Sequence, residues 1–277
     1  MHYGGYAANK NFEEEWAMVD TNNNNKRYLW REKHLSYDHH NAEFQQWWIQ
    51  LALDMCSNDE IDGIFVDGLC KLERGFLPVK NGNAWLDTAK QLRAQLPPGK
   101  MLIGNTLRAE MGREGNYKYM RYLDGSYLEG WAHPKNLERT LQLISKALNN
   151  GKIIMLNAEP HMDMGKLNEI KSLDERYDYL NTSKSLDFYL GYFLLVVEEH
   201  AYISFHHGVD LRPRAKCCFD NTRFAAVTRA LGKPLGKYIN KGDGKYTREF
   251  EYLTVHVDIK SQEGQLVVKH TNVKDEL

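Results

Sequence analysis

The sequence has few cysteines, and their arrangement excludes a disulfide framework. Its 277 residues include 4 cysteines, and no C-x-x-C pair is present. The adjacent residues Cys217 and Cys218 rarely form a bridge with each other, because the geometry is unfavourable. We therefore expect ordinary buried thiols, at Cys56 and Cys70 as well.

Motifs for metals and cofactors are missing too. The pairs His39-His40 and His206-His207 invite a zinc interpretation, but neighbouring residues on a strand point to opposite faces. Each pair therefore offers one ligand at most, and no compact His, Asp and Cys motif accompanies either pair. We expect no metal and no cofactor.

The sequence also lacks an excess of one charge and a long apolar run. Lys and Arg number 36 against 37 Asp and Glu, which gives a formal net charge of −1. Such a balance creates no field that attracts nucleic acid or an acidic membrane. No run of about 18 apolar residues is present, so no membrane span is expected. Neither nucleic acid nor a membrane is an expected partner, and the oligomeric state is open.

The two ends of the sequence carry conflicting information on location. The start shows no basic and apolar leader for secretion. The end, Lys274-Asp275-Glu276-Leu277, spells the retention signal of the endoplasmic reticulum. We interpret this ending as a coincidence, or as part of a fragment whose true start is missing. A secreted or periplasmic location is expected in the second case, and a cytoplasmic location otherwise.

The sequence does contain a short motif that occurs twice. Residues Asp62–Gly68 and Asp124–Gly130 each read as a short apolar strand that begins at an Asp-Gly pair and ends at an acidic residue and a glycine. A glycine after the acid lets the backbone turn sharply, so that the carboxylate faces a cleft. We expect Asp62 and Asp124, at the opposite ends of these strands, to be structural.

Short apolar segments alternate with segments of helical period, which predicts parallel βα units. Strands are expected near 1–6, 28–30, 62–67, 101–105, 126–129, 152–157 and 202–206, and helices near 44–55, 84–96, 134–148 and 174–199. The simplest α/β fold is a (β/α)8 TIM barrel over residues 1–221 that lacks its first βα unit. An open doubly wound sheet is the alternative, but no Gly-rich phosphate loop follows the first strand.

The last part of the chain has a different pattern. Residues 222–277 are expected to contain a final barrel helix over 224–231 and then an antiparallel hairpin. Its strands are expected from the alternation over 245–257 and from residues 266–268. This region is predicted to pack on the barrel as a small appended sheet.

A TIM barrel carries its active site at the carboxyl ends of its strands, and two of these ends carry carboxylates. Glycoside hydrolysis needs such a pair: one carboxylate attacks or stabilises the anomeric carbon, and the other protonates the leaving oxygen. Apolar neighbours of Glu129, such as Leu128 and Trp131, disfavour an ionised carboxyl, so Glu129 is the expected acid. Asp67 is the expected nucleophile or base, although Asp before Gly is also a common turn element. We expect the two carboxyls within about 10 Å of each other, where about 5 Å implies retention and roughly 6.5–9.5 Å inversion.

Other polar and aromatic residues at the predicted strand ends are expected to bind a poly- or oligosaccharide. They are Tyr3, Lys71, Asn105, Arg108, Trp131, Asn157, Glu159, His206 and His207. Two alternatives stay open. A polysaccharide lyase that acts on a uronic-acid polymer would use residues such as Tyr3, Lys71, Arg108 and His207, and a non-catalytic barrel would only bind glycans.

Four segments resemble glycoside-hydrolase-like TIM-barrel proteins of the hypothetical glycosyl hydrolase family 15 type. They are Asp62–Gly68, Tyr127–Trp131, Gly232–Gly236 and Tyr246–Phe250, and the resemblance extends from Met1 to about Val268. The layout is similar to that of clan D barrels, in which acids at the ends of strands four and six act as nucleophile and acid/base. With the absent first strand counted, Asp67 ends strand four and Glu129 ends strand six, so the resemblance implies those roles.

Overall fold

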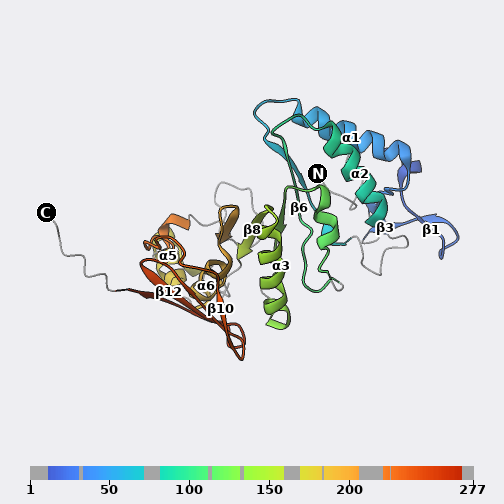
Figure 1. The fold of residues 1–277 in the computed structure, drawn as a ribbon. Coiled ribbons are helices and arrows are strands. Elements are labelled where there is room, and N and C mark those ends of the chain that lie inside the picture. Colours follow the sequence, from blue (N-terminus) through green and yellow to red (C-terminus); the bar gives the residue numbers. More distant parts are fainter. Residues whose placement is uncertain are drawn as a thin grey trace. The chain divides into compact units, whose positions relative to one another are not determined.

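The structure is a computed structural model, in which the chain forms two compact units (Figure 1). Unit 1 comprises Met1–Leu128 and Asn150–Ile154, and unit 2 comprises Glu129–Asn149 and Met155–Leu277. The residues that the structure describes are 12–30, 34–71, 82–111, 114–131, 134–158, 169–182, 184–205, 221–224 and 226–269. The expected strand at 1–6 lies outside the described residues.

A parallel sheet organises unit 1. Strands β5 (Gly63–Val66), β6 (Met101–Gly104) and β7 (Gly125–Leu128) pair in parallel, with Ile64 opposite Leu102 and Ile103 opposite Gly125. The order of the full sheet is β5-β6-β7-β8-β9, with β8 at Ile153–Ala158 and β9 at Ala201–Phe205. Each of these five strands was predicted. They form a five-stranded sheet, and within the described residues no pairing closes it into a barrel.

Two helices of unit 1 follow the predicted helical period. Helix α1 (Ala42–Cys56) starts at Asn41, whose side chain accepts a hydrogen bond from the Phe44 backbone N–H at 3.0 Å. Helix α2 (Gly82–Gln95) lies beside α1 (Figure 1). The rings of Trp48 and Trp85 meet edge to face at 5.5 Å and are fully buried.

His39 belongs to this core. Its ring is fully buried, and its Nδ1 lies 3.2 Å from the Thr88 hydroxyl, which itself donates to the Ala84 carbonyl. The side chains of Cys56 and Cys70 are buried as expected, while Cys217 and Cys218 lie outside the described residues.

The segment at 28–30 is not a barrel strand, so that prediction was wrong. Strand β3 (Leu29–Trp30) pairs antiparallel with β4 (His34–Leu35) in a separate two-stranded sheet. The preceding strands β1 (Val19–Asp20) and β2 (Lys26–Arg27) form a similar pair. Antiparallel strands need only a short turn, so these short segments find partners locally rather than in the parallel sheet.

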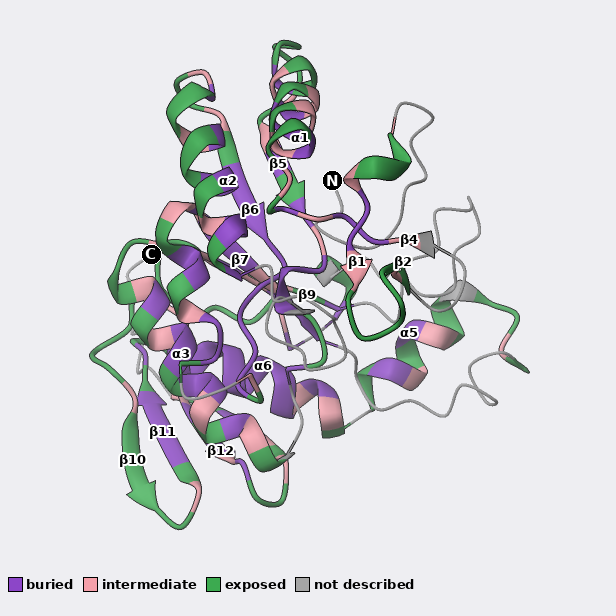
Figure 2. Ribbon diagram, turned by 90° about the vertical axis from the view of Figure 1, so that its right-hand side faces the viewer, coloured by how far each residue is buried: buried purple, intermediate pink, exposed green. Residues whose placement is uncertain are grey.

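Unit 2 combines helices with an antiparallel sheet. The helices are α3 (Leu137–Asn149), α5 (Leu173–Asn181) and α6 (Lys184–Val196), where one helix was expected over 174–199. Strands β10 (Ile239–Gly242), β11 (Lys245–Glu249), β12 (Leu253–Asp258) and β13 (Glu263–Val268) pair in that order. Figure 2 shows α6 as mostly buried. A Cβ on Gly264 would lie 2.3 Å from the Asp187 carbonyl oxygen, so only glycine permits this approach of β13 to α6.

The C-terminal sheet overturns two predictions. The alternating segment 245–257 is not one strand, because a turn at Glu251 and Tyr252 separates β11 from β12. The described residues of 224–231 form no helix: a short 3-10 helix at Asn221–Arg223 is followed by turns over 226–228. Phe224 is buried against Phe205 at 5.5 Å, and this anchoring outweighs the helical spacing of its neighbours.

The remaining short elements of the described chain are 3-10 helices. They lie at Glu14–Trp16, Leu69–Lys71, Tyr117–Tyr122 and Pro134–Asn136. None of the helices in the described ranges combines the length and the apolar character needed to cross a membrane.

Candidate functional site

Asp67 directly follows β5, where the chain makes a sharp turn. The next residue, Gly68, has φ +80°, a left-handed conformation that residues with a Cβ adopt only with strain. This turn brings the Gly68 N–H to 2.7 Å from the Asp67 Oδ1, to which it donates a hydrogen bond. The Asp-Gly pair thereby fixes the carboxylate at the carboxyl end of the strand.

Asn105 and Arg108 extend this arrangement from the end of β6. The Asn105 Nδ2 donates to the Asp67 Oδ1 at 3.0 Å, and the Arg108 Nη2 donates to the Asn105 Oδ1 at 2.6 Å. Both side chains are buried, with exposed fractions of 2% and 6%. Since a guanidinium only donates, the Asn105 oxygen must face Arg108 and its amide NH2 must face Asp67. Two donors therefore converge on one oxygen of Asp67.

The backbone around Asn105 is also fixed. Its N–H donates to the Val66 carbonyl at 2.9 Å, and its own carbonyl accepts from the Cys70 N–H at 2.8 Å. The Ser126 hydroxyl on β7 accepts from the N–H groups of Thr106 at 3.4 Å and Leu107 at 3.2 Å. The loop that carries Asn105 and Arg108 is thus tied to both neighbouring strands.

Asp124 lies at the other end of the strands and is structural, as predicted. Its Oδ2 accepts from the Arg93 Nη1 at 2.6 Å and from the Leu102 N–H at 2.7 Å. Nearby, the Lys152 ammonium donates to the Leu123 carbonyl at 2.6 Å, and its burial lowers its pKa. Asp62 contributes its backbone carbonyl, which accepts from the Met101 N–H at 2.8 Å.

The predicted site residues of unit 2 have unlike surroundings. Glu129 is exposed, whereas Trp131 is buried and its Nε1 donates to the Asn157 carbonyl at 2.7 Å. The Trp131 ring packs against Tyr189 at 5.4 Å and Tyr192 at 4.8 Å. The apolar setting expected for Glu129 is therefore wrong, because the neighbouring indole turns into the core. Trp131 and the buried Asn157 belong to that core, and their contact with a sugar stays a prediction.

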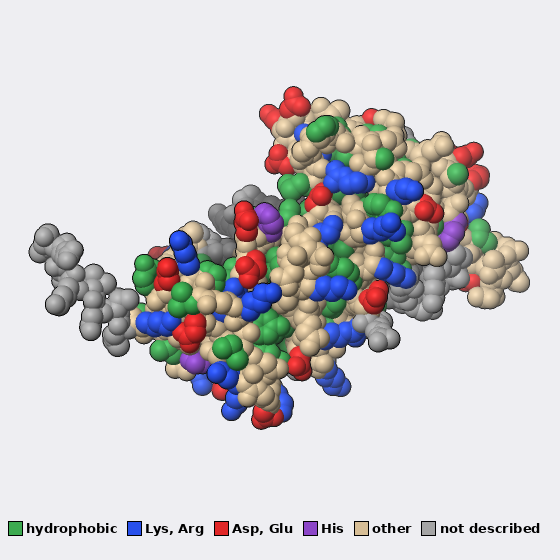
Figure 3. Space-filling view, viewed as in Figure 1, with side chains coloured by type: hydrophobic (Ala, Val, Ile, Leu, Met, Phe, Trp, Pro, Cys, Tyr) green, Lys and Arg blue, Asp and Glu red, His purple; other side chains and the backbone are tan. Residues whose placement is uncertain are grey.

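Several predictions fall outside the described residues. Tyr3, Glu159, His206 and His207 are among them, and of Lys71 only the backbone is described. The separation of Asp67 and Glu129, which belong to different units, stays a prediction. Groups of three or more His, Cys, Asp or Glu that would hold a metal are absent from the described part of the chain. Figure 3 shows Lys and Arg interspersed with Asp and Glu on the face in view.

The fold and the site define an α/β protein with a carboxylate held by hydrogen bonds at the carboxyl edge of a parallel sheet. The model of the hypothetical glycosyl hydrolase family 15 matches residues 2–254, and the chain belongs to that family. Family membership supports a hydrolase and gives the lyase alternative no support. Among curated proteins, no sequence matches the chain.

Three solved structures similar to the chain are α-amylases. A noncanonic maltogenic α-amylase from Thermotoga neapolitana has a TM-score of 0.48 and 14% identity, over 89% of this chain and 60% of that one. An Anoxybacillus α-amylase has a TM-score of 0.49 and 13% identity, over 92% of this chain and 62% of that one. The α-amylase of Geobacillus thermoleovorans, complexed with acarbose, has a TM-score of 0.47 and 12% identity, over 92% of this chain and 63% of that one. The chain thus spans less than two thirds of the length of each of these structures.

Proposed function

We propose that the protein is a glycoside hydrolase that cleaves a poly- or oligosaccharide, and that its five-stranded sheet belongs to a (β/α)8 barrel. The observation that carries the proposal is the fixed Asp67 carboxylate in a chain of a glycosyl hydrolase family. Its Oδ1 accepts the hydrogen bonds from the Gly68 N–H and the Asn105 Nδ2, while its Oδ2 accepts no hydrogen bond from the described residues. A carboxylate with one anchored and one available oxygen suits attack on an anomeric carbon or activation of water.

Asp67 is the nucleophile or base in this proposal, and Glu129 is the acid. Strands β5 and β7 are separated only by β6, so their ends lie about 10 Å apart at the usual spacing of strands. Asp67 follows the first and Glu129 follows the second. This spacing supports a carboxylate pair on the two sides of a glycosidic bond, and side-chain directions would decide between retention and inversion.

Asn105 and Arg108 were expected to bind the sugar, and we propose a supporting role for them next to Asp67. We assign them as positioning residues, because Asn105 donates to Asp67 and Arg108 fixes the orientation of that amide. Hydrogen bonds from buried neighbours hold a reacting group in the geometry that the transition state needs.

The test is a screen of neutral and anionic polysaccharides with mass analysis of the products. We expect new reducing ends, and a loss of at least about a thousandfold in rate for Asp67→Asn and for Glu129→Gln. Asp62→Asn is the matched control, since this exposed acid precedes the same strand, and its activity should be unchanged. Full activity of both site variants would overturn the carboxylate pair, and an unsaturated product that absorbs ultraviolet light would indicate a lyase instead.

A further inference from the structure

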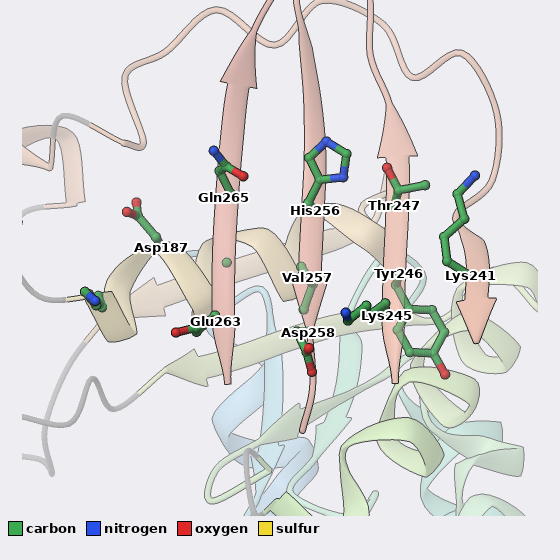
Figure 4. A pocket seen from close by; sticks show the side chains of 12 residues that line it. Asp187, Lys241, Lys245, Tyr246, Thr247, His256, Val257, Asp258, Glu263 and Gln265 are labelled. Carbon is green, nitrogen blue, oxygen red and sulfur yellow. The ribbon is translucent and has the colours of Figure 1, made fainter. Parts of the chain in front are cut away.

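Unit 2 contains a pocket that the function proposed above does not use. It has a volume of about 680 Å³ and lies over the C-terminal sheet, bordered by the first turn of α6 (Figure 4). Pockets for small molecules usually have volumes of about 300–1,000 Å³. This pocket was not predictable from the sequence, because neither the turn between β11 and β12 nor the strand β10 was expected.

A row of polar side chains crosses this pocket at right angles to the strands. Thr247 on β11 is opposite His256 on β12, and His256 is opposite Gln265 on β13. Figure 4 shows Lys241 of β10 beyond Thr247 at one end of the row and Asp187 of α6 beyond Gln265 at the other. The row thus offers an ammonium, a hydroxyl, an imidazole, an amide and a carboxyl, one from each of five elements.

Most of this hydrogen-bonding capacity is unused by the protein. The side chains of Lys241, His256 and Gln265 form no hydrogen bond with any described residue, and only Thr247 is engaged, donating to the Val255 carbonyl at 2.9 Å. A ligand that lies along the row would therefore find donors and acceptors that form no hydrogen bond with the described residues. From Thr247 to Gln265 the row spans two strand spacings, about 10 Å.

The charge of the lining indicates what kind of ligand fits. Its three lysines are Lys184, Lys241 and Lys245, and its three carboxylates are Asp187, Asp258 and Glu263. A balanced lining favours neither an anion nor a cation, whereas hydroxyl groups donate to the carboxylates and accept from the ammonium groups equally well. A neutral ligand with many hydroxyls satisfies every group of the row.

We propose that this pocket is a second carbohydrate site, which binds a neutral oligosaccharide across β11, β12 and β13 without cleaving it. The choice of a sugar among hydroxyl-rich ligands rests on the proposed glycoside hydrolase function. The site would hold a long substrate on unit 2 while another part of the same polymer is cleaved, and such linkage raises the effective concentration of the substrate.

The test measures binding by the full chain carrying Asp67→Asn, so that turnover does not consume the ligand. Neutral gluco-, galacto-, manno- and xylo-oligosaccharides are titrated, with an oligogalacturonate as the anionic comparison. The reporter is the His256 imidazole resonance, identified among the 11 histidines by its loss in His256→Asn. We expect a saturable shift with at least one neutral sugar, and a Kd at least about tenfold weaker after Gln265→Ala.

Tyr252→Ala is the control for this site. Tyr252 is an exposed aromatic ring in the turn next to the sheet, outside the pocket, and its loss should leave the Kd unchanged. The inference is overturned if no neutral sugar shifts the His256 resonance, if only the oligogalacturonate does, or if Tyr252→Ala weakens binding as much as Gln265→Ala. With Asp67 intact, Gln265→Ala should leave the hydrolysis of short substrates unchanged, so failure of the carboxylate pair and failure of this site give different results.

Discussion

Arg248 is a buried cation that holds the end of α6, and its replacement by Met tests how unit 2 is stabilised. Its side chain is 2% exposed. The Nη1 lies 3.2, 3.1 and 2.8 Å from the carbonyls of Leu194, Leu195 and Val197, the Nε donates to the Gly236 carbonyl at 2.9 Å, and the Nη2 pairs with Glu198 at 3.0 Å. The last carbonyls of a helix have no partner within the helix, so Arg248 supplies their donors and a positive charge where the helix dipole is negative.

The expected cost of Arg248→Met follows from these contacts. Each buried carbonyl left without a donor costs roughly 1–3 kcal/mol, and Arg248 serves four carbonyls. Removal of the buried charge recovers part of this cost, because its desolvation penalty disappears. The Met side chain also keeps most of the apolar stem. We therefore expect a loss of about 3 kcal/mol in the free energy of unfolding, near the lower end of what breaking a buried ion pair costs.

The measurement is unfolding in urea and by heat, followed by near-ultraviolet circular dichroism. A loss of about 3 kcal/mol corresponds to a fall of roughly 10 °C in the Tm of a unit of this size. Arg248→Lys should lose less, since one ammonium reaches some of the carbonyls. Arg229→Met is the matched control, because Arg229 is exposed and reaches the Leu266 carbonyl only at 3.4 Å, and it should change stability by no more than about 0.5 kcal/mol. Equal effects of Arg248→Met and Arg229→Met would refute the reasoning.

Two further substitutions test the proposed catalytic site and the pocket. Arg108→Met should lower kcat about a hundredfold with little change in KM, because Arg108 acts through Asn105. Arg93→Met is the control: it breaks the ion pair with Asp124 and should keep kcat. A raised KM with unchanged kcat in Arg108→Met would make Arg108 a substrate contact instead. Burial raises the pKa of Asp187 against the opposing effect of Arg229, so its contribution to stability is greatest below the unfolded pKa and is lost as the pH rises through the folded pKa. Asp187→Asn should therefore raise the Tm near neutral pH and change it little at about pH 3. The measurement is the Tm of both proteins over a series of pH values, and the reverse pH dependence would contradict a raised pKa of Asp187 in the folded state.

The parallel strands were predictable because local sequence determines them. Strand β5 is a short apolar run between two Asp-Gly pairs, and this pattern marks both its start and its sharp exit. Helix α1 was predictable because buried residues recur with the helical period over a full 15 residues. In both cases one segment contains the whole pattern, and tertiary contacts do not change the type of element that the pattern predicts.

The C-terminal region was less predictable because distant contacts shape it. The alternation over 245–257 continues through Glu251 and Tyr252, so nothing in the period marks the turn between β11 and β12. The turn forms where the Tyr252 N–H donates to the Leu231 carbonyl at 3.1 Å and the Glu251 N–H donates to the Lys233 carbonyl at 3.0 Å. Arg248 likewise stands in a motif of the family resemblance, but its role at α6 depends on residues about 50 positions away.

The candidate site was predictable in its composition but not in its contacts. Since Asp67 and Asn105 follow neighbouring parallel strands, their proximity follows from the fold class alone. The direction of the Arg108 side chain does not follow from the fold class, because an arginine four residues after the end of a strand can extend into solvent as well as fold back. The buried amide of Asn105 decides the direction, because its oxygen accepts a hydrogen bond from the Arg108 Nη2, and the proposed role of Arg108 as a support for Asp67 rests on this contact.

The order of these hydrogen bonds also determines which oxygen of Asp67 is left for the proposed reaction. Arg108 can only donate, so the Asn105 oxygen is committed to it and the Asn105 amide can offer only N–H groups to Asp67. The Gly68 N–H meets the same Oδ1, so that oxygen has two donors and is a poor site for a new covalent bond or a proton. Oδ2 is then the atom that would attack the anomeric carbon or accept a proton from water. Asn105→Asp would replace the donor by an acceptor and remove this distinction between the two oxygens, although the side chain keeps its size.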